Sequence, residues 1–439
     1  MTSPRTILIV GTGGRDFHVF NTIYRDDDTS RVLGFTDADL CPGEAERYPS
    51  CLCGERYPDG IPILPEAQLE ELIARLGVQT VVFAYSEMAG SEVARLAARA
   101  LAAGADFQIT SPTASMLPAT KPVIAVTAAR TGSGKSPTVR YLAELLRSWG
   151  LKVAVFRHPL QVHSFAEDRS HSYSIIDDAQ IDSCALPLRQ PFEGLPGAWV
   201  FSGLDYGAVL ASAQASADVI LWDGAGNDLP FLRPRLHLVL IDALRAGDEV
   251  RYFPGEVSLL LADAVIINKC DAATIEQIEQ VEASVTRVNP AAEILTADSP
   301  VIVENAERVS GRTVVVLEEM LTLSLGNLRP GAGLAAAHQV GVSAIISPQP
   351  HAVGSLARVY RRHPEAHSVL PNLGYSPSDL SDFKATLDAT PSDALINATR
   401  LDLSTLLDTS RPEAKASFGL RPHDPERLTR MLRAAIQPR

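Results

Sequence analysis

The sequence predicts an α/β protein made of three successive regions. Its 439 residues exceed the usual size of one hydrophobic core, which favours two or three domains. Short apolar runs alternate with helix-spaced segments along most of the chain, and this alternation is typical of parallel strands joined by helices. Two apolar runs lead directly into a glycine-rich turn and a helix. We expect the three regions to cover residues 1–118, 119–318 and 319–439.

The first region opens with the apolar run 6–10 and the turn Gly11-Thr-Gly13-Gly14-Arg15-Asp16. A strand, a glycine turn and a helix in this order predict a Rossmann-like domain. Asp37 stands about 20 residues further on, where such folds hold the ribose of a dinucleotide, but Asp16 replaces the third glycine of that fingerprint. NAD, another ligand or a purely architectural turn all stay open. The remaining expected elements are strand 32–35, an excursion at 41–62, helix 66–77, strand 78–86, helix 91–104 and strand 105–110.

Composition and charge exclude several classes of protein. A formal net charge of −13 argues against a general nucleic-acid binder, because counterion release needs clustered Lys and Arg. The five scattered cysteines suit a reducing compartment. Cys41, Cys51 and Cys53 lack a matching Cys/His pair at zinc spacing, so ordinary thiols are preferred to a metal site. Without a signal peptide or a membrane helix of roughly 18 apolar residues, a cytoplasmic location away from membranes is expected.

The central region has the element order of a nucleotide-binding α/β domain. The expected elements are strand 123–128, helix 138–150, strand 152–159, an irregular stretch at 160–198, helix 206–215, strands 218–224 and 236–242, helical residues 248–262, strand 264–271, helix 274–288, and strands 293–298 and 313–318. The third region then alternates apolar segments, namely 333–341, 343–355, 367–374 and 393–403.

Residues 129–136, Ala-Arg-Thr-Gly-Ser-Gly-Lys-Ser, have the spacing of a Walker A loop whose first glycine is Ala129. Backbone N–H groups of Thr131, Gly132, Ser133 and Gly134 can turn toward phosphates, and the following helix presents its N-terminus. Lys135 can reach the β- and γ-phosphates, and Ser136 can ligate Mg²⁺. We therefore predict a site for a nucleoside triphosphate here.

Two further strand ends support this site. The apolar strand 219–222 ends at Asp223, as a Walker B aspartate that holds Mg²⁺ must. The strand 264–267 ends in Asn268-Lys269-Cys-Asp271, the N-K-x-D form of a guanine-binding loop. Asp271 could accept two N–H groups from a base while Asn268 and Lys269 brace the loop. Base binding is predicted at this loop, and ATP versus GTP stays open.

Taken together, these motifs resemble one family, the cyclic 2,3-diphosphoglycerate synthetases and their bacterial relatives. The resemblance runs over nearly the whole chain. It is carried in order by GRDFHVFN at 14–21, YPDGIPILPEAQLEELI at 57–73, VVFAYS at 81–86, LAAGADF at 101–107, KPVIAVTAARTGSGKS at 121–136, FRHPL at 156–160, ILWDGAGNDLPF at 220–231, ADAVIINKCD at 262–271 and PHAVGS at 350–355.

The resemblance implies a reaction in which the two phosphates of 2,3-diphosphoglycerate join in an internal anhydride while ATP is split to ADP and phosphate. Lys135, Asp223, Arg130, Arg157 and His158 would then be catalytic, with Mg²⁺ on Ser136 and Asp223. Arg130, Arg157 and His158 would form a cationic pocket for the phosphorylated acid. Asn227 and Asp228 could help to place a second metal ion.

Three segments depart from the family pattern: 182–194, 317–333 and 397–403. A changed acceptor substrate therefore stays open. A regulatory or chaperone-like GTPase that binds a partner protein is the alternative of another class, and an NAD-dependent oxidoreductase is a third possibility. We expect a homo-oligomer, although the sequence does not fix its size or the role of the cysteines.

Overall fold

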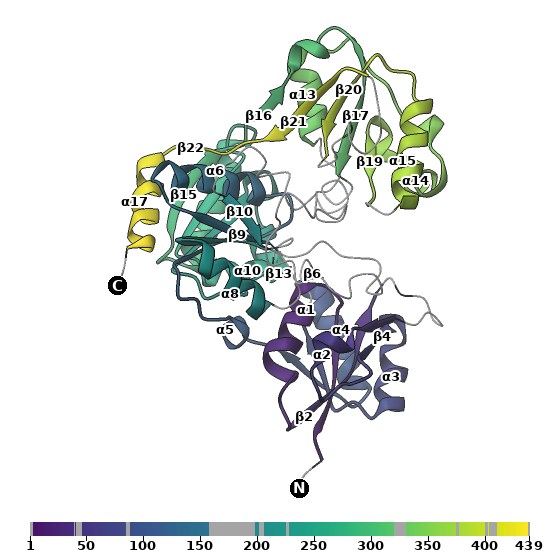
Figure 1. Ribbon diagram of the computed structural model, residues 1–439, viewed down its shortest axis with the longest axis vertical. Helices are drawn as coiled ribbons and strands as arrows, with labels where there is room; N and C mark the ends of the chain where they lie inside the picture. The colour runs from purple at the N-terminus through teal and green to yellow at the C-terminus, as the bar shows by residue number, and fades with distance from the viewer. Residues whose placement is uncertain are drawn as a thin grey trace.

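The computed structural model describes residues 3–38, 40, 46–84, 88–157, 198–201, 206–224, 228–319, 331–374, 377–399, 403 and 411–437. These residues form three large sheets of mostly parallel strands with helices packed against them, and one small two-stranded sheet (Figure 1). The predicted α/β fold class is therefore confirmed. Within the same residues, the helices are too short or too polar to cross a bilayer.

The N-terminal sheet has the strand order β3-β4-β2-β1-β5-β7, and only β3 is antiparallel to its neighbour. Its strands are β1 (Arg5–Val10), β2 (Ser30–Asp37), β3 (Glu46–Tyr48), β4 (Ile61–Pro65), β5 (Thr80–Phe83) and β7 (Asp106–Ile109). Its helices are α1 (Gly14–Val19), a π-helix (Phe20–Tyr24), α2 (Ser50–Cys53), α3 (Leu69–Leu76), α4 (Gly90–Ala102) and α5 (Pro112–Ser115). The segment 41–62, expected to be irregular, thus contains the strand β3, which pairs with β4. Its buried Tyr48 stacks on Phe17 with ring centroids 4.4 Å apart.

The central sheet has the order β10-β9-β11-β8-β12-β14-β15-β22. Its strands are β8 (Val123–Ala128), β9 (Val153–Arg157), β10 (Ala198–Phe201), β11 (Val219–Asp223), β12 (Leu236–Asp242), β14 (Ala264–Asn268), β15 (Glu293–Asp298) and β22 (Arg421–Pro422). Its helices are α6 (Lys135–Ser148), α8 (Tyr206–Ser216), α9 (Asp248–Arg251), α10 (Gly255–Leu260), α11 (Ile275–Val288) and α17 (Pro425–Ile436). The strand β8 is buried at every residue, which explains its unbroken apolar run.

The third sheet consists of β16 (Val301–Glu304), β17 (Thr313–Glu319), β18 (Ala344–Ile345), β19 (Leu370–Asn372), β20 (Ala394–Ala398) and β21 (Glu413–Phe418). Its helices are α13 (Ala332–Val340), α14 (Gly354–Arg362) and α15 (Pro377–Ala389). The predicted limit at residue 318 falls inside β17, which pairs with β20 and β19. Apolar patterning does not tell which sheet a strand joins. Helix α17 returns to the central domain, where Leu428 and Leu432 are buried in its core.

Two short links, Ser299-Pro300 and Gly419-Leu420, join the central and third sheets. They are adjacent, since the N–H of Gly419 donates to the carbonyl oxygen of Pro300 at 2.8 Å. The link Ser299-Pro300 follows the last residue of β15, and the link Gly419-Leu420 follows the last residue of β21. β15 is antiparallel to β22, and β16 is antiparallel to β21. Both links therefore lie at the carboxyl ends of β15 and β21. The carboxyl edges of the two sheets therefore face each other (Figure 1).

The N-terminal domain also meets the central domain through segments that follow its strands. β6 (Met88–Ala89) pairs with β13 (Tyr252–Phe253) in a two-stranded antiparallel sheet. The ring of Phe253 lies 5.4 Å from that of Phe83, the last residue of β5. His18 stacks on Phe231 with ring centroids 4.1 Å apart. The loops of three sheets are thus brought toward one central region.

Candidate nucleotide site

The phosphate loop lies between β8 and α6, as the sequence predicts for a strand, a glycine turn and a helix. Gly132 and Gly134 have φ angles of 82° and 103°, which residues with a side chain rarely adopt. Thr131 and Ser133 lie on the same turn, and the hydroxyl of Ser133 donates to the carbonyl oxygen of Arg130 at 2.8 Å. Lys135 begins α6 and half-buried Ser136 follows it. The loop therefore presents backbone N–H groups and a helix N-terminus together.

Ala129 is compatible with this loop although a Walker A motif has glycine at its position. Its N–H donates to the carbonyl oxygen of Leu240 at 2.9 Å, so the residue continues the pairing of β8 with β12. Ala129 is absent from the described residues that combine a side chain with a positive φ. A Cβ atom therefore costs nothing at this position.

Asp223 is buried between two cations at the end of β11. Its carboxylate lies 3.0 Å from Arg157 Nε and 3.6 Å from Lys135 Nζ. Lys135 also donates to the carbonyl oxygen of Gly224. Arg157 reaches this position because it ends β9, directly opposite Asp223 in the parallel register. Three of the predicted catalytic residues are thus brought together.

The carboxylate of Asp223 has the properties of a metal ligand. Its side chain is fully buried, and neither oxygen accepts a hydrogen bond of good geometry from the described residues. The two cations contact it as ion pairs, so their charge balances the carboxylate while its lone pairs are not committed to N–H donors. Hard oxygen donors of this kind suit Mg²⁺.

The predicted base-binding loop is tied to the phosphate loop. The buried amide of Asn268 donates to the carbonyl oxygen of Ser133 at 2.9 Å, and a Cβ atom on Gly134 would meet that same amide. Lys269 has a left-handed φ of 65°, and its ammonium group lies 2.8 Å from Asp242 Oδ2. Asp271 is exposed, and its Oδ1 accepts the N–H of Ser299 at 3.1 Å.

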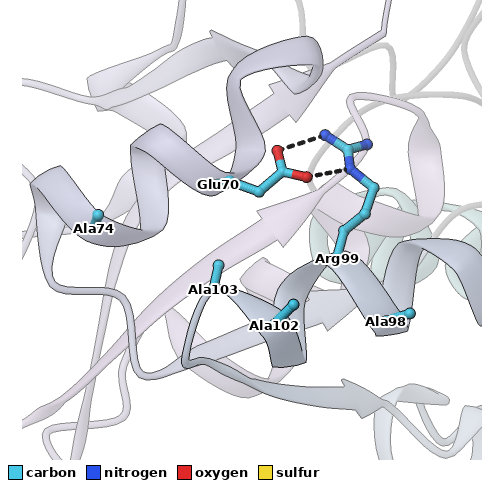
Figure 2. A pocket seen from close by; sticks show the side chains of 6 residues that line it. All are labelled: Glu70, Ala74, Ala98, Arg99, Ala102 and Ala103. Atoms are coloured by element: carbon cyan, nitrogen blue, oxygen red, sulfur yellow. Dashed lines mark hydrogen bonds and ion pairs between the residues drawn. The ribbon is translucent and has the colours of Figure 1, made fainter.

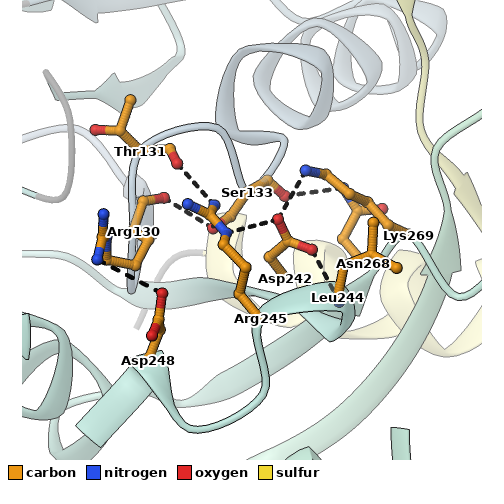
Figure 3. A network of polar contacts seen from close by, with 9 residues as sticks. All are labelled: Arg130, Thr131, Ser133, Asp242, Leu244, Arg245, Asp248, Asn268 and Lys269. Atoms are coloured by element: carbon orange, nitrogen blue, oxygen red, sulfur yellow. Dashed lines mark hydrogen bonds and ion pairs between the residues drawn. The ribbon is translucent and has the colours of Figure 1, made fainter. Parts of the chain in front are cut away.

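Asp242 and Arg245, which are not among the predicted site residues, support both loops (Figure 3). Arg245 Nε donates to Asp242 Oδ2 at 2.9 Å, and Nη2 donates to the carbonyl oxygen of Thr131 at 2.7 Å. Asp242 also binds Lys269, so one buried carboxylate holds cations from both sides. A signal was present, because the apolar strand 236–241 ends in an acid as the strand before Asp223 does.

Arg130, at the start of the phosphate loop, contacts other residues than Asp242. Its guanidinium is 3.5 Å from Asp248 Oδ2 and 3.5 Å from the centroid of the Tyr252 ring. A cation above an aromatic ring and beside an acid is held firmly. Arg130 therefore connects the phosphate loop to β13, the strand that pairs with the N-terminal domain. Residue 158, the predicted catalytic histidine, lies outside the described residues, as does Asn227.

The N-terminal glycine turn is filled by its own aspartate. Asp16 Oδ2 accepts the N–H of Gly13 at 2.6 Å, and a Cβ atom on Gly11 would lie 2.5 Å from Asp16 Oδ1. Burial raises the pKa of Asp16 well above its usual range. The hydroxyl of Thr12 donates to Asp37, the acid considered for a ribose. These contacts favour architecture over NAD binding at this turn.

A hollow of about 500 Å³ lies between α3 and α4, away from the phosphate loop (Figure 2). Its wall consists of alanines and one ion pair in which Arg99 contacts Glu70 at 2.6 and 2.9 Å. Four alanines and a satisfied ion pair offer few groups for chemistry. Among the cysteines, Cys51 is exposed and Cys53 is buried, and Cys41 lies outside the described residues.

Comparisons with known proteins identify relatives that are named after two different products, arginine and cyclic 2,3-diphosphoglycerate. A family model described as "Cyclic 2,3-diphosphoglycerate synthetase, P-loop domain" matches residues 170–297. The chain is 38% identical over 418 residues to the arginine synthetase ArcE of Thermococcus kodakarensis, covering 95% of this chain and 93% of that relative. It is 29% identical over 117 residues to the cyclic 2,3-diphosphoglycerate synthetase of Methanothermus fervidus, covering 26% of this chain and 25% of that relative.

Among solved structures, LpxK of Aquifex aeolicus in complex with ATP is similar over 73% of this chain and 90% of its own length. The TM-score is 0.47 and the sequence identity is 14%. The whole-chain relative and the relatives matched over a quarter of the chain thus carry different product names.

Proposed function

Because the chain belongs to the cyclic 2,3-diphosphoglycerate synthetase family, which includes the arginine synthetase of Thermococcus kodakarensis, we propose that it activates an acceptor oxygen by transfer of the γ-phosphoryl group of ATP. A nucleophile then displaces the phosphorylated oxygen, so that the products are ADP, phosphate and the joined compound. The ion-paired cluster of Lys135, Asp223 and Arg157 beside the phosphate loop is the observation that carries this proposal.

Each part of the nucleotide site has a role in this proposal. Lys135 neutralises charge on the transferred phosphoryl group, which is the main contribution that proteins make to phosphoryl transfer. Ser136 and Asp223 would hold Mg²⁺, and that ion would neutralise further phosphate charge when bound. Arg157 then contacts the oxygens of the acceptor, as a planar guanidinium does well.

We propose that ATP, rather than GTP, is the phosphoryl donor. Bidentate recognition of guanine would require both oxygens of Asp271, and its Oδ1 would then have to share its lone pairs with the N–H of Ser299, which it accepts at 3.1 Å. Asn268 and Lys269 bind Ser133 and Asp242 instead of pointing to a ligand of their own. These contacts support a loop that braces the phosphate site more than one that selects guanine.

Arginine is the product that we propose, because the likeness to the arginine synthetase extends over 95% of the chain. Its acceptor would be citrulline, in which a ureido oxygen stands where arginine has a nitrogen. ATP phosphorylates that oxygen, ammonia attacks the ureido carbon, and the oxygen leaves in inorganic phosphate. Citrulline, ammonia and ATP thus give arginine, ADP and phosphate, with all atoms balanced.

Formation of cyclic 2,3-diphosphoglycerate is the second candidate, favoured by the family model that matches residues 170–297. In that reaction one phosphate of the acceptor attacks the other after activation. Arg130, Arg157 and His158 would supply its positive charge. The guanidinium of Arg130 lies 3.5 Å from Asp248, and that of Arg157 lies 3.0 Å from Asp223. These two carboxylates reduce the net positive charge that Arg130 and Arg157 offer to a polyanion.

One assay separates these candidates. Purified protein is incubated with Mg²⁺ and ATP or GTP, and receives citrulline with ammonium chloride, 2,3-diphosphoglycerate, or no acceptor. Phosphate release is measured and products are identified by mass spectrometry. Arginine formed only with citrulline and ammonia supports the first candidate, whereas a cyclic product supports the second. Nucleotide turnover that ignores every acceptor would favour a regulatory GTPase and overturn the synthetase proposal.

A further inference from the structure

Polar side chains gather at the carboxyl ends of three neighbouring strands in the third sheet. Glu318 and Glu319 end β17, Asn372 ends β19, and Asn397 lies near the end of β20. Glu319 is directly opposite Asn372 in the parallel register, and Leu317 is opposite Asn397. We call Glu318, Glu319, Asn372 and Asn397 the acceptor edge.

Asn372 is buried and its amide is aimed into this edge. Its side-chain nitrogen donates to Glu319 Oε2 at 3.3 Å, and the residue is only 3% exposed. Its Oδ1 has no hydrogen-bond partner among the described residues. A buried amide oxygen without a donor is unfavourable. The unsatisfied oxygen therefore indicates a ligand that brings an N–H group.

The neighbouring groups also accept hydrogen bonds. Glu318 is 2% exposed, and its Oε1 accepts the N–H groups of Gly333 and Leu334 at 2.8 and 3.3 Å. Burial raises the pKa of Glu318 to about 7, with Glu319 adding to the rise, and no cation is among the described groups that shift this pKa. Negative charge on Glu318 and Glu319 favours a nearby cation over a phosphate.

The acceptor edge faces the phosphate loop. The links Ser299-Pro300 and Gly419-Leu420 join the carboxyl ends of β15 and β21, and β17 and β20 run parallel to β21. β15 in turn runs parallel to β14, whose last residue, Asn268, contacts the phosphate loop. In α/β proteins, ligands bind outside the carboxyl ends of parallel strands. An acceptor held at this edge would therefore be directed toward the nucleotide.

We propose that the acceptor edge binds the ureido or guanidinium end of an amino acid of the arginine class, with Glu319 and Asn372 accepting its N–H groups. This inference rests on the proposed function and extends it to the residues that choose the acceptor. The Glu319 carboxylate and the amide oxygen of Asn372 match a group that carries several N–H donors. The same edge excludes a polyphosphorylated acid by repulsion.

The test measures binding of L-arginine to the full chain by isothermal titration calorimetry. Wild type is compared with Glu319→Gln and with Glu304→Gln, a control that removes an exposed carboxylate from β16 of the same sheet. We expect Glu319→Gln to weaken arginine binding at least about tenfold and Glu304→Gln to leave it unchanged. Binding of a non-hydrolysable ATP analogue should be unaffected in both variants. Asn372→Ala serves as a second variant should Glu319→Gln fold poorly.

Two outcomes overturn the inference. One is arginine binding that survives both Glu319→Gln and Asn372→Ala. The other is a wild-type protein that binds 2,3-diphosphoglycerate but not arginine. Failure of the proposed function is distinct, because it would appear as absence of acceptor-stimulated phosphate release in the wild type. Arginine synthesis by a protein whose acceptor-edge variants bind arginine normally would preserve the function and refute this site.

Discussion

The side-chain amide of Asn268 donates a hydrogen bond of 2.9 Å to the carbonyl oxygen of Ser133. This bond joins a loop at the end of β14 to the phosphate loop at the end of β8, two strands that are separated in the sheet by β12. The position of the phosphate loop therefore depends on a residue far away in the sequence.

Asn268→Ala should weaken nucleotide binding at least about tenfold, because Ser133 loses the donor that holds its carbonyl and the loop becomes less well placed. The free energy of unfolding should fall by about 1–3 kcal/mol. Calorimetry with an ATP analogue and urea unfolding measure the two effects. Asn289→Ala is the control, since Asn289 makes similar bonds to the carbonyl oxygens of Leu259 and Ala262. It should lose stability but keep nucleotide affinity, and equal affinities in both variants would contradict the prediction.

Lys135→Ala should reduce nucleotide turnover about 1000-fold, because a positioned charge is lost from the transferred phosphoryl group. The fold should survive, since Arg157 still lies 3.0 Å from the buried carboxylate of Asp223. Phosphate release and the circular dichroism spectrum are the measurements. Lys152→Ala, which changes an exposed lysine in the connection between α6 and β9, should be fully active. Unchanged turnover in Lys135→Ala would refute the assignment of the phosphate loop.

Arg245→Ala should destabilise the protein by about 1–3 kcal/mol, because Asp242 loses one buried donor but keeps Lys269 as an ion-pair partner. It should also weaken nucleotide binding, because Thr131 loses the donor to its carbonyl oxygen. Arg245→Lys keeps the charge but cannot reach Asp242 and Thr131 together, so its nucleotide affinity should stay low while part of the stability returns. Urea unfolding and calorimetry check this, and full rescue by lysine would show that only charge matters.

Glu318 should make stability depend on pH. Burial raises its pKa from 4.5 to about 7, so the folded state favours the protonated carboxyl. The resulting stabilisation is complete below pH 4.5 and is lost as the pH rises through 7. Glu318→Gln can still accept from Gly333 and Leu334 but does not titrate. Its advantage over wild type should grow by up to about 3 kcal/mol between pH 5 and 8.

Chemical denaturation at several pH values measures this difference without added ligand. Glu304→Gln, an exposed change in the same sheet, should show no dependence on pH relative to wild type. If wild type and Glu318→Gln keep a constant difference in unfolding free energy from pH 5 to 8, the buried carboxyl does not titrate as proposed.

The residues that local patterns predict best are those at the ends of single strands. Lys135 and Asp223 could be placed from sequence because a glycine turn and a buried strand fix them within a few residues. The pairing of Asp223 with Arg157 needed the structure, because the predicted strand 152–159 runs past Arg157 whereas β9 ends there. Family membership, predicted from the ordered motifs, is confirmed by the whole-chain relative.

What the sequence could not supply are contacts that depend on which strands become neighbours. The contacts of Arg130 with Asp248 and Tyr252 are an example, since the positions of those two residues follow from the fold beyond β12. Likewise, β17 reads as one more apolar strand, and only its pairing with β19 and β20 brings Glu319 next to Asn372. The acceptor edge is therefore a product of sheet topology.

The adjacent links Ser299-Pro300 and Gly419-Leu420 have a mechanical consequence. One connector would leave the third sheet free to swivel about several axes, whereas two connectors bonded to each other restrict that freedom. The carboxyl edge of the third sheet is thereby kept on the side of the phosphate loop.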